Sequence, residues 1–280
     1  MTVRDAPLPR RLRIVPPRSW QMLSPAELWQ YRELLFFFVW RDVKVRYKQT
    51  VLGAAWAVLQ PLATTALFTV FFGRLAGLSR HVDGPYALHV YVGLLPWTFF
   101  ANAVTLAGNS LVGSSHLISK VYFPRVLVPA AAIVGGLVDF AIAFAFLLVL
   151  MGVYGAVPPI QALLFPLFLL GTLGAAAGAG LLFAALIVEY RDFRYVMAFA
   201  TQLWMFATPV LYPLSIVPAK WQTIYAINPM VGMIAGFRWS LLGTPCAPTV
   251  LLVSTISAAA LLAVGLRYFL QVERRFADII

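Results

Sequence analysis

RDVKVRYKQTVLGAAWAVLQPL, residues 41–62, joins a basic stretch directly to a long apolar one. From Val51 to Gly73 the sequence has no charged residue. A helix rises about 1.5 Å per residue, so about 20 apolar residues cross the hydrocarbon core of a bilayer. We therefore predict a membrane protein that first crosses the bilayer here. Basic side chains are costly to place in lipid, so those before the crossing are expected to stop at the headgroups: Arg41, Lys44, Arg46 and Lys48.

The composition extends this prediction to the whole chain. Of its 280 residues, 61% are hydrophobic and 11% are charged, whereas a soluble domain has about 25% charged residues. No polar stretch is long enough to form a separate soluble domain. The single cysteine, Cys246, excludes an intramolecular disulfide and a cysteine-based metal cluster. The first twenty residues lack an apolar segment, so we expect no cleavable signal peptide.

Six apolar runs predict the fold class, an all-α membrane protein with six transmembrane helices. The fifth run is the shortest and ends at two prolines. Small residues in the fourth run, Gly171, Gly174, Gly178 and Gly180, predict close helix packing. The six runs are Val51–Gly73, Tyr86–Leu111, Val126–Tyr154, Ile160–Val188, Tyr195–Leu211 and Pro248–Leu270.

The distribution of basic residues predicts the orientation. If the N-terminal end is cytoplasmic, 17 of the 21 Lys and Arg residues lie inside, as the excess of basic residues in cytoplasmic loops requires. Both termini are then cytoplasmic. The net charge of +11 is thereby explained as membrane-facing, which argues against a nucleic-acid partner. The basic residues left outside are Arg74, Arg80, Lys220 and Arg238.

An amphipathic interfacial helix is predicted before the first crossing. Ser24 and Glu27 form a capping box around Pro25. The apolar run Leu34–Trp40 is too short to span, and a basic helix with an aromatic face lies in the membrane interface. This helix is either a membrane anchor alone or an anchor that also rests on a cytoplasmic partner. The dense charge of residues 41–48 favours the second alternative. Its charged residues are Glu33, Arg41, Asp42, Lys44, Arg46 and Lys48.

Two absences limit the function. A Walker A loop needs Gly-Lys, and the four lysines follow Val, Tyr, Ser and Ala, so the chain has no such ATP site. The predicted spans hold one acid, Asp139, which gives no carboxylate pair for metal-dependent catalysis. Asp139 is either a helix-packing or backbone-bonded carboxyl inside the bundle, or a polar contact with substrate or at a subunit interface. We expect no cofactor on this chain.

Five segments in the same order resemble the membrane subunit of type-2 ABC transporters that export polysaccharides, with the O-antigen branch the most similar. The family also includes exporters of capsule and teichoic acid. The resemblance covers most of residues 25–270. The segments are FFFVWRDVKVRYKQTVLGAAWAVLQPL (36–62), YVGLLPWTFFANAV (91–104), NSLVGSSHLISKVYFPR (109–125), VEYRDFRYVMAFATQLWMFATPVLYP (188–213) and INPMVGMIAGFRWSLLG (227–243).

The resemblance implies a homodimeric permease in the bacterial inner membrane that exports a lipid-linked polysaccharide. Two separate ATP-binding cassette subunits would bind ATP and Mg²⁺. It divides the chain into an N-terminal tail with the interfacial helix (1–50), a six-span domain (51–270) and a C-terminal tail (271–280).

The resemblance also implies two cytoplasmic loops that matter for function. The segment Ser114–Arg125 would contain a short coupling helix that contacts the ATPase. Its candidate residues are Ser115, His116, Leu117, Ile118, Ser119, Lys120, Tyr122 and Arg125. The second loop is a family contact or a local salt-bridge cluster, and its charged residues are Glu189, Arg191, Asp192 and Arg194.

The segment between the fifth and sixth runs, Tyr212–Ala247, is too apolar for a free loop. The resemblance implies that it folds back into the membrane as re-entrant helices that close the periplasmic side. Asn228-Pro229 begins or breaks a helix, and Gly232 with Gly236 predicts close packing.

Aromatic rings along a path through the membrane suit a polymer of sugars, although each of them could equally pack in the core or at the interface.

Two other function classes stay open. One is an ion- or proton-coupled glycolipid flippase that uses Asp139 without an ATPase. The other is a membrane glycosyltransferase, for which Asp83 and Asp192 are poor candidates. The candidate channel or gate residues are Trp56, Tyr91, Trp97, Phe100, Asp139, Trp204, Tyr225, Asn228 and Arg238.

Overall fold

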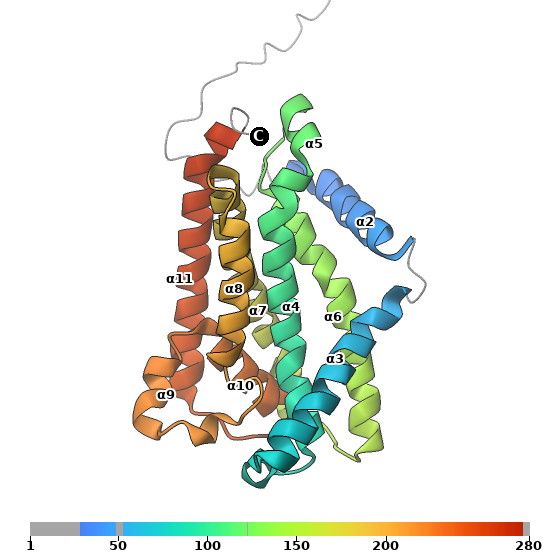
Figure 1. The fold of residues 1–280 in the computed structure, drawn as a ribbon, viewed down its shortest axis with the longest axis vertical. Coiled ribbons are helices and arrows are strands. Elements are labelled where there is room, and N and C mark those ends of the chain that lie inside the picture. Colours follow the sequence, from blue (N-terminus) through green and yellow to red (C-terminus); the bar gives the residue numbers. More distant parts are fainter. Residues whose placement is uncertain (1–28, 49–52, 122, 277–280) are drawn as a thin grey trace, which may run out of the picture.

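The computed structural model describes residues 29–48, 53–121 and 123–276, and every regular element in that part is a helix (Figure 1). The predicted capping box at Ser24 and Glu27, and Tyr122 of the coupling loop, lie outside the described residues. The helices are α2 (Arg32–Lys48), α3 (Trp56–Phe68), α4 (Tyr86–Gly113), α5 (Ser115–Lys120), α6 (Leu127–Val153), α7 (Phe165–Glu189), α8 (Phe193–Phe206), α9 (Ala219–Tyr225), α10 (Pro229–Leu242) and α11 (Pro248–Val272).

Short helical turns extend or join these elements. α3 continues as a π-helical segment, η2 (Thr69–Leu75), and α7 is preceded by the 3-10 turn η4 (Ile160–Leu164). The remaining 3-10 turns are η1 (Gly53–Ala55), η3 (Leu78–His81), η5 (Leu214–Ile216) and η6 (Glu273–Arg275). A turn follows α6, with Gly155 at a φ of 66°, which favours glycine.

Five helical segments in the described part are long and apolar enough to cross a membrane: Trp56–Leu75, Tyr86–Gly113, Leu127–Val153, Ile160–Glu189 and Pro248–Val272. They confirm five of the six predicted runs. The fifth run instead forms α8, which has 14 residues and is about 21 Å long. α8 stops before Pro209, since proline lacks the donor that a helix needs and disfavours helix in the preceding residue. A sixth crossing is not confirmed.

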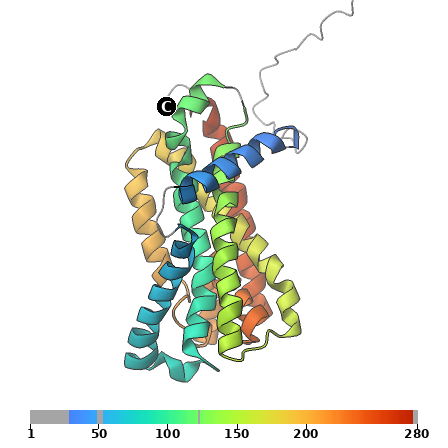
Figure 2. The same ribbon diagram turned by 90° about the vertical axis from the view of Figure 1, so that its right-hand side faces the viewer.

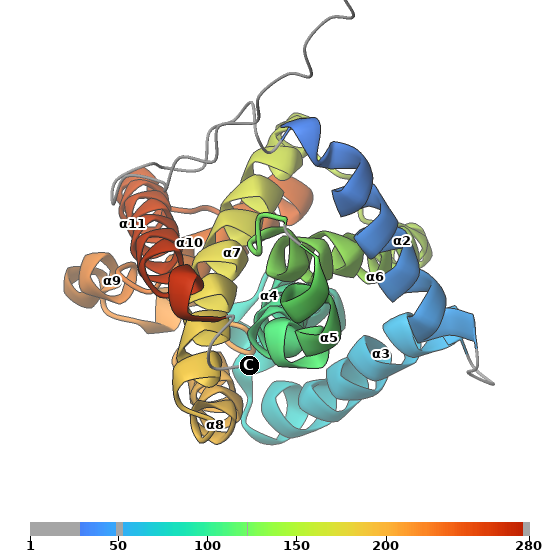
Figure 3. The same cartoon turned by 90° about the horizontal axis from the view of Figure 1, so that it is seen from above.

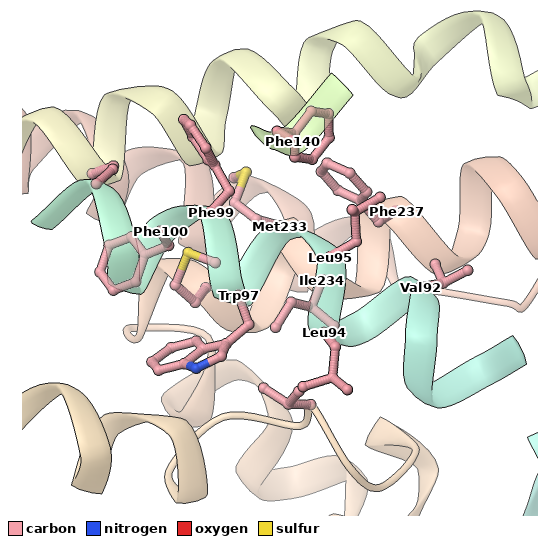
Figure 4. Packing of buried hydrophobic residues seen from close by; sticks show 14 of the residues in the cluster. Val92, Leu94, Leu95, Trp97, Phe99, Phe100, Phe140, Met233, Ile234 and Phe237 are labelled. Carbon is pink, nitrogen blue, oxygen red and sulfur yellow. The ribbon is translucent and has the colours of Figure 1, made fainter. Parts of the chain in front are cut away.

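α4 is the central helix of the bundle. In an 18-residue apolar stretch of α4, 72% of the residues are buried, compared with 17% in Trp56–Leu75 and 22% in α11. Seen from above, α3, α6, α7 and α8 surround it (Figure 3). Its buried side chains include Leu95 and Phe99, which pack with Phe140 of α6 and Phe237 of α10 (Figure 4). The outer helices expose Leu, Val and Phe side chains, as lipid contact requires.

The two ends of the bundle carry different elements. α2, α5 and the C-terminal end of α11 lie at one end, and α9 lies at the other, with α10 nearby (Figure 1). Figure 2 shows α2, in blue, lying across the bundle near the first end. α2 packs mainly against α6. We call the end with α2 and α5 the α5 end and the opposite one the α9 end.

Glycines allow α7 and α11 to touch through their backbones. A Cβ at Gly178 would lie 2.5 Å from the backbone carbonyl carbon of Leu261, and one at Gly265 would clash with the carbonyl oxygen of Gly178. Close approach at small residues is typical of helix pairs in membranes. Gly171 and Gly180 also face neighbouring side chains, whereas Gly174 has no atom within 4 Å of the Cβ position. The packing prediction is therefore confirmed for three of the four glycines and wrong for Gly174.

The segment Tyr212–Ala247 folds as η5, α9 and α10. As predicted, a helix begins at Asn228-Pro229, and the Asn228 side chain accepts a hydrogen bond from Met230 N at 3.0 Å. Close packing at Gly232 and Gly236 is confirmed, since their Cβ positions are blocked by Ser254 and Phe168. Whether these helices re-enter the membrane stays a prediction.

Replacing one glycine of α7 tests the backbone contact. Gly178→Ala should lower the free energy of unfolding by about 1–3 kcal/mol, because overpacking forces the backbones apart. Gly174→Ala, one turn away, should be neutral or slightly stabilising, since alanine favours helix over glycine by about 0.5–1 kcal/mol. Thermal unfolding of both variants in detergent measures the difference, and equal losses would contradict the contact.

Candidate functional site

The α5 end presents a short helix beyond the end of α4. α5 exposes His116 and Lys120, while Ile118 is 5% exposed and turned into the bundle. Leu117 is half-buried beside it. The predicted coupling loop therefore contains a helix with one anchored and one exposed face. Ser115 begins that helix, and Ser119 lies within it.

A buried cluster anchors this loop to several other elements. Ile118 and Phe123 belong to it, together with Phe38 of α2, Leu181 of α7 and Phe269 of α11. The rings of Phe38 and Phe123 meet edge to face at 5.5 Å between centroids. Displacement of α5 would consequently disturb α2, α7 and α11 together.

Polar contacts connect the same loop and the end of α7 to the C-terminal end of α11. The backbone N–H of Arg125 donates to Glu273 Oε1 at 2.8 Å, and its guanidinium donates to the carbonyl oxygen of Glu273. Tyr268 Oη donates to Glu189 Oε2 at 2.6 Å. α11 therefore holds both predicted cytoplasmic loops in place.

The second loop is not a local salt-bridge cluster. Within the described residues, Glu189, Arg191, Asp192 and Arg194 make no ion pair with one another, and Glu189 instead lies 4.0 Å from Arg275. Arg191 and Asp192 are exposed in the turn between α7 and α8, and Arg194 is exposed in the first turn of α8. The open alternative, a contact with a partner, stays a prediction.

α2 exposes apolar side chains on more than one side. Phe36 and Phe37 are 70% and 59% exposed, whereas the next residue, Phe38, is buried. A strict division into one apolar and one polar face is therefore not confirmed. Of its charged residues, Glu33, Lys44 and Lys48 are exposed, and Arg41 pairs with the adjacent Asp42 at 2.8 Å.

Asp139 is bound by the end of α2, a partner that neither sequence-based alternative named. Arg46 forms an ion pair with one carboxylate oxygen, and Tyr47 Oη donates a hydrogen bond to the other. Burial, together with the hydrogen bond to Asp139, raises the pKa of Tyr47 to about 12. The phenol thus keeps the proton that it donates. We call these three residues the Arg46–Tyr47–Asp139 cluster.

The cluster lies far along α6. Asp139 is twelve residues, or about 18 Å, from the first residue of this 27-residue helix. An unpaired carboxylate at the centre of a membrane helix costs about 3 kcal/mol. The ion pair with Arg46 offsets the cost of the Asp139 carboxylate, and the same ion pair fastens α2 to α6.

A cavity of about 240 Å³ adjoins the cluster. Residues of α2, α3, α4 and α6 line it, among them Trp56, Gln60, Thr98 and Asn102. Trp56, a predicted channel residue, is 57% exposed at the first position of α3. Trp56 and Asp139 are thus the two predicted channel residues that this cavity brings together.

Three of the predicted channel aromatics lie inside the subunit. Tyr91 and Phe100 are fully buried, and Trp97 is 3% exposed. Tyr91 Oη donates to the carbonyl oxygen of Ala143 at 3.1 Å. Figure 4 shows Trp97 and Phe100 among the core side chains. In one subunit these rings pack helices together, and a role in lining a channel stays a prediction.

The other predicted gate residues form a network toward the α9 end. Trp204 Nε1 donates to Asn228 Oδ1 at 2.8 Å, and the Tyr212 and Tyr225 hydroxyls bond each other. A second cavity of about 690 Å³, mostly apolar, lies beside Trp204, Tyr225 and Asn228. The network thus joins α8, α9 and α10.

Arg238 is buried rather than exposed at an outer loop. Its guanidinium donates to the carbonyl oxygens of Pro209 and Val210, both at 2.6 Å, and more weakly to those of Tyr212 and His89. The carbonyls of Pro209, Val210 and Tyr212 follow the end of α8, where no helix satisfies them. Arg238 therefore permits the irregular backbone there, and its place on the outer side of the membrane stays a prediction.

Sequence reasoning missed Tyr47, Phe123 and Glu273. A signal existed for the first: a lone acid in an apolar helix requires a cation, and the nearest flanking basic stretch is residues 41–48. Nothing in the sequence alone points to Phe123 or Glu273, because their partners lie on distant elements.

Breaking the cluster should loosen the end of α2. We expect Asp139→Asn to raise the amide hydrogen exchange of residues 41–48 about tenfold, because Arg46 loses its partner. Asp42→Asn is the matched control, since Arg41 and Asp42 are neighbours on the same helix. Hydrogen-exchange mass spectrometry measures both, and an unchanged rate in Asp139→Asn would show that the pair does not hold α2.

Comparison with known proteins agrees with this architecture. Residues 33–242 match the family described as ABC-2 type transporter. The chain is 32% identical to the O-antigen export system permease protein RfbA of Myxococcus xanthus over 76% of this chain and 81% of that protein. It is 28% identical to the protein of the same name from Klebsiella pneumoniae, over 89% and 95%.

A further relative has a broader name. The inner membrane transport permease YadH of Escherichia coli K12 is 28% identical over 69% of this chain and 78% of that protein. The family match covers most of the described helices, from α2 to α10. The chain is therefore a multi-pass membrane protein that belongs to the ABC-2 type transporter family.

Proposed function

We propose that this chain is the permease half of an ATP-driven exporter that moves a lipid-linked, O-antigen-like polysaccharide outward across the bacterial inner membrane. The observation on which this rests most is the α5 end, where an exposed short helix is tied by packing and hydrogen bonds to α2, α6, α7 and α11. The export of O-antigen by its relatives supports the substrate class.

A separate ATPase subunit supplies the energy and holds ATP and Mg²⁺. No Walker A sequence occurs in the chain. Lys120 is exposed on α5, Arg191 in the turn before α8, and Arg194 in the first turn of α8. The surface that they form is basic apart from Asp192, so the docking face of the ATPase is expected to be acidic. This α5 end then faces the cytoplasm.

A second copy of the chain completes the channel. One face of α8 is buried through Met197 and Thr201, while Tyr195, Phe199 and Phe206 are more than half exposed on the same helix. These aromatic rings, together with the exposed side chains of α3, offer a large surface that a second subunit can cover. Each subunit of the homodimer would bind one ATPase.

The ion- or proton-coupled flippase is the weaker candidate. It needs Asp139 as a proton carrier, but Arg46 and Tyr47 occupy both carboxylate oxygens. Proton-driven glycolipid movement by the chain alone, abolished in Asp139→Asn, would favour that candidate over an ATP-driven exporter.

Reversing one charge on α5 tests the coupling surface. Lys120→Glu should lower substrate-dependent ATPase activity of the complex about tenfold, because a like charge then faces the acidic partner. Lys220→Glu, on exposed α9 at the opposite end, is the matched control and should keep activity. Both variants should insert into the membrane normally.

The assay uses the chain purified together with its co-expressed ATPase subunit and reconstituted in vesicles with lipid-linked glycan. Normal ATPase activity and transport in Lys120→Glu would remove this residue from the coupling surface. A failure of the wild-type chain to form a stable complex with any co-expressed ATPase subunit would contradict the proposed function itself.

A further inference from the structure

The cavity beside the Arg46–Tyr47–Asp139 cluster has a mostly apolar lining that also contains polar groups which packing does not require. Gln60 of α3 and Asn102 of α4 are exposed at the cavity, and within the described residues their side-chain amides bond to no other group. An amide offers two donors and an acceptor. Two unoccupied amides on neighbouring helices therefore face one small space.

The charge of the lining is balanced. Arg46 and Asp139 are the charged residues that line the cavity, and they neutralise each other in an ion pair. A phosphate would need a guanidinium or ammonium group that is not already engaged, and a cationic headgroup would need a free carboxylate. The lining suits a ligand with many hydrogen-bonding groups and no net charge.

The carboxylate of Asp139 can still accept hydrogen bonds. Each oxygen receives one bond in the cluster, but a carboxylate accepts up to about four, and the side chain is 27% exposed. Hydroxyl groups donate to such an acceptor without displacing Arg46. The amides of Gln60 and Asn102 can accept from or donate to further hydroxyls.

An aromatic ring completes the lining. Trp56 is 57% exposed at the cavity and presents a flat apolar surface next to these polar groups. A sugar ring combines hydroxyls at its edge with an apolar C–H face, so it matches both features at once. The cavity, at about 240 Å³, is smaller than the roughly 300–1,000 Å³ of sites for drug-sized ligands. It fits one ring.

We infer that this cavity binds a single uncharged sugar that a membrane lipid presents at the level of α2. The inference deepens the proposed function, since it assigns a sugar subsite to the subunit. The sugar is either the residue next to the lipid anchor of the exported glycan or the headgroup of a bulk glycolipid. Both sources share the chemistry that the lining recognises.

Lipid retention by the purified full chain tests the inference without any ATPase. The chain is placed in nanodiscs of phosphatidylethanolamine that contain one of four lipids. These are glucosyl-diacylglycerol, diacylglycerol, a polyprenyl diphosphate bearing one hexose, and the same polyprenyl diphosphate without it. Native mass spectrometry then measures how much of each lipid the chain retains after release from the nanodisc.

For at least one of the two lipid anchors, we expect the wild-type chain to retain more of the glycosylated lipid than of the same lipid without the sugar. We call this quotient the retention ratio. The anchor that gives the larger ratio identifies the source of the sugar. Asn102→Leu and Gln60→Leu should each reduce the ratio about fivefold, the effect of losing about one hydrogen bond. Both side chains are exposed, so neither variant removes core packing.

Asn109→Leu is the matched control. Asn109 lies two turns further along α4, outside the cavity, and its amide donates to Thr105 O at 2.8 Å. This variant should keep the wild-type ratio. Equal retention with and without the sugar for both anchors, or equal ratios in wild type, Asn102→Leu and Gln60→Leu, would overturn the inference. A wild-type chain that retains the glycosylated lipid but shows no ATP-driven transport with its ATPase subunit would instead count against the proposed function alone.

Discussion

The hydrocarbon core of a bilayer offers no hydrogen bond to a backbone carbonyl, so a helix that stops within an apolar bundle needs protein groups at its end. α8 stops at Phe206, and the carbonyl oxygens of Pro209, Val210 and Tyr212 receive hydrogen bonds from Arg238 of α10. Arg238 is buried, and its own position depends on α10, which begins at the Asn228 cap. The Asn228 cap and the Arg238 guanidinium therefore act together. Without both of them, the backbone between α8 and α9 would have to leave the bundle or continue as helix.

The same bundle contains helices that are fixed and helices that are loosely held. α7 and α11 touch through the backbones of Gly178 and Gly265, which leaves no room for sliding. α3 is different, because few of its residues are buried. The first half of α2 packs through Phe38 with Leu34, Leu35 and Val39 beside it, whereas its end is held to α6 by one charge cluster. Switching transitions use rigid groups of helices that move about weaker contacts. The weaker contacts here surround the cavity lined by Trp56 and Asn102, so a motion of α2 or α3 would change the shape of that cavity first.

The long helices could be predicted because hydropathy is a local property: each apolar run contains its own evidence. Pro209 indicates that the helix before it is short. The number of crossings, however, depends on how deep each helix lies in the bilayer, which no local sequence pattern determines. Side-chain roles were harder to predict. Arg238 resembles any other basic residue in an outer segment, and its burial depends on carbonyls that lie 28 residues or more away along the chain. Trp97 and Phe100 resemble channel aromatics equally well, and only the three-dimensional packing shows that they lie in the core.

Asp139 illustrates how two ideas from the sequence combine in one place. The sequence predicts that the basic stretch 41–48 is an orientation signal that stays at the headgroups. It also predicts that Asp139 is a costly acid inside a span. In the structure Arg46 and Asp139 compensate each other, and removal of one partner from such a pair costs more than removal of both. A charged ligand at this point would compete with one partner and release α2 from α6. An uncharged sugar would not, because it bonds to the remaining lone pairs of the carboxylate and to the amides of Gln60 and Asn102. The cavity can therefore exchange a neutral ring while α2 remains attached, as the proposed binding of one lipid-borne sugar requires.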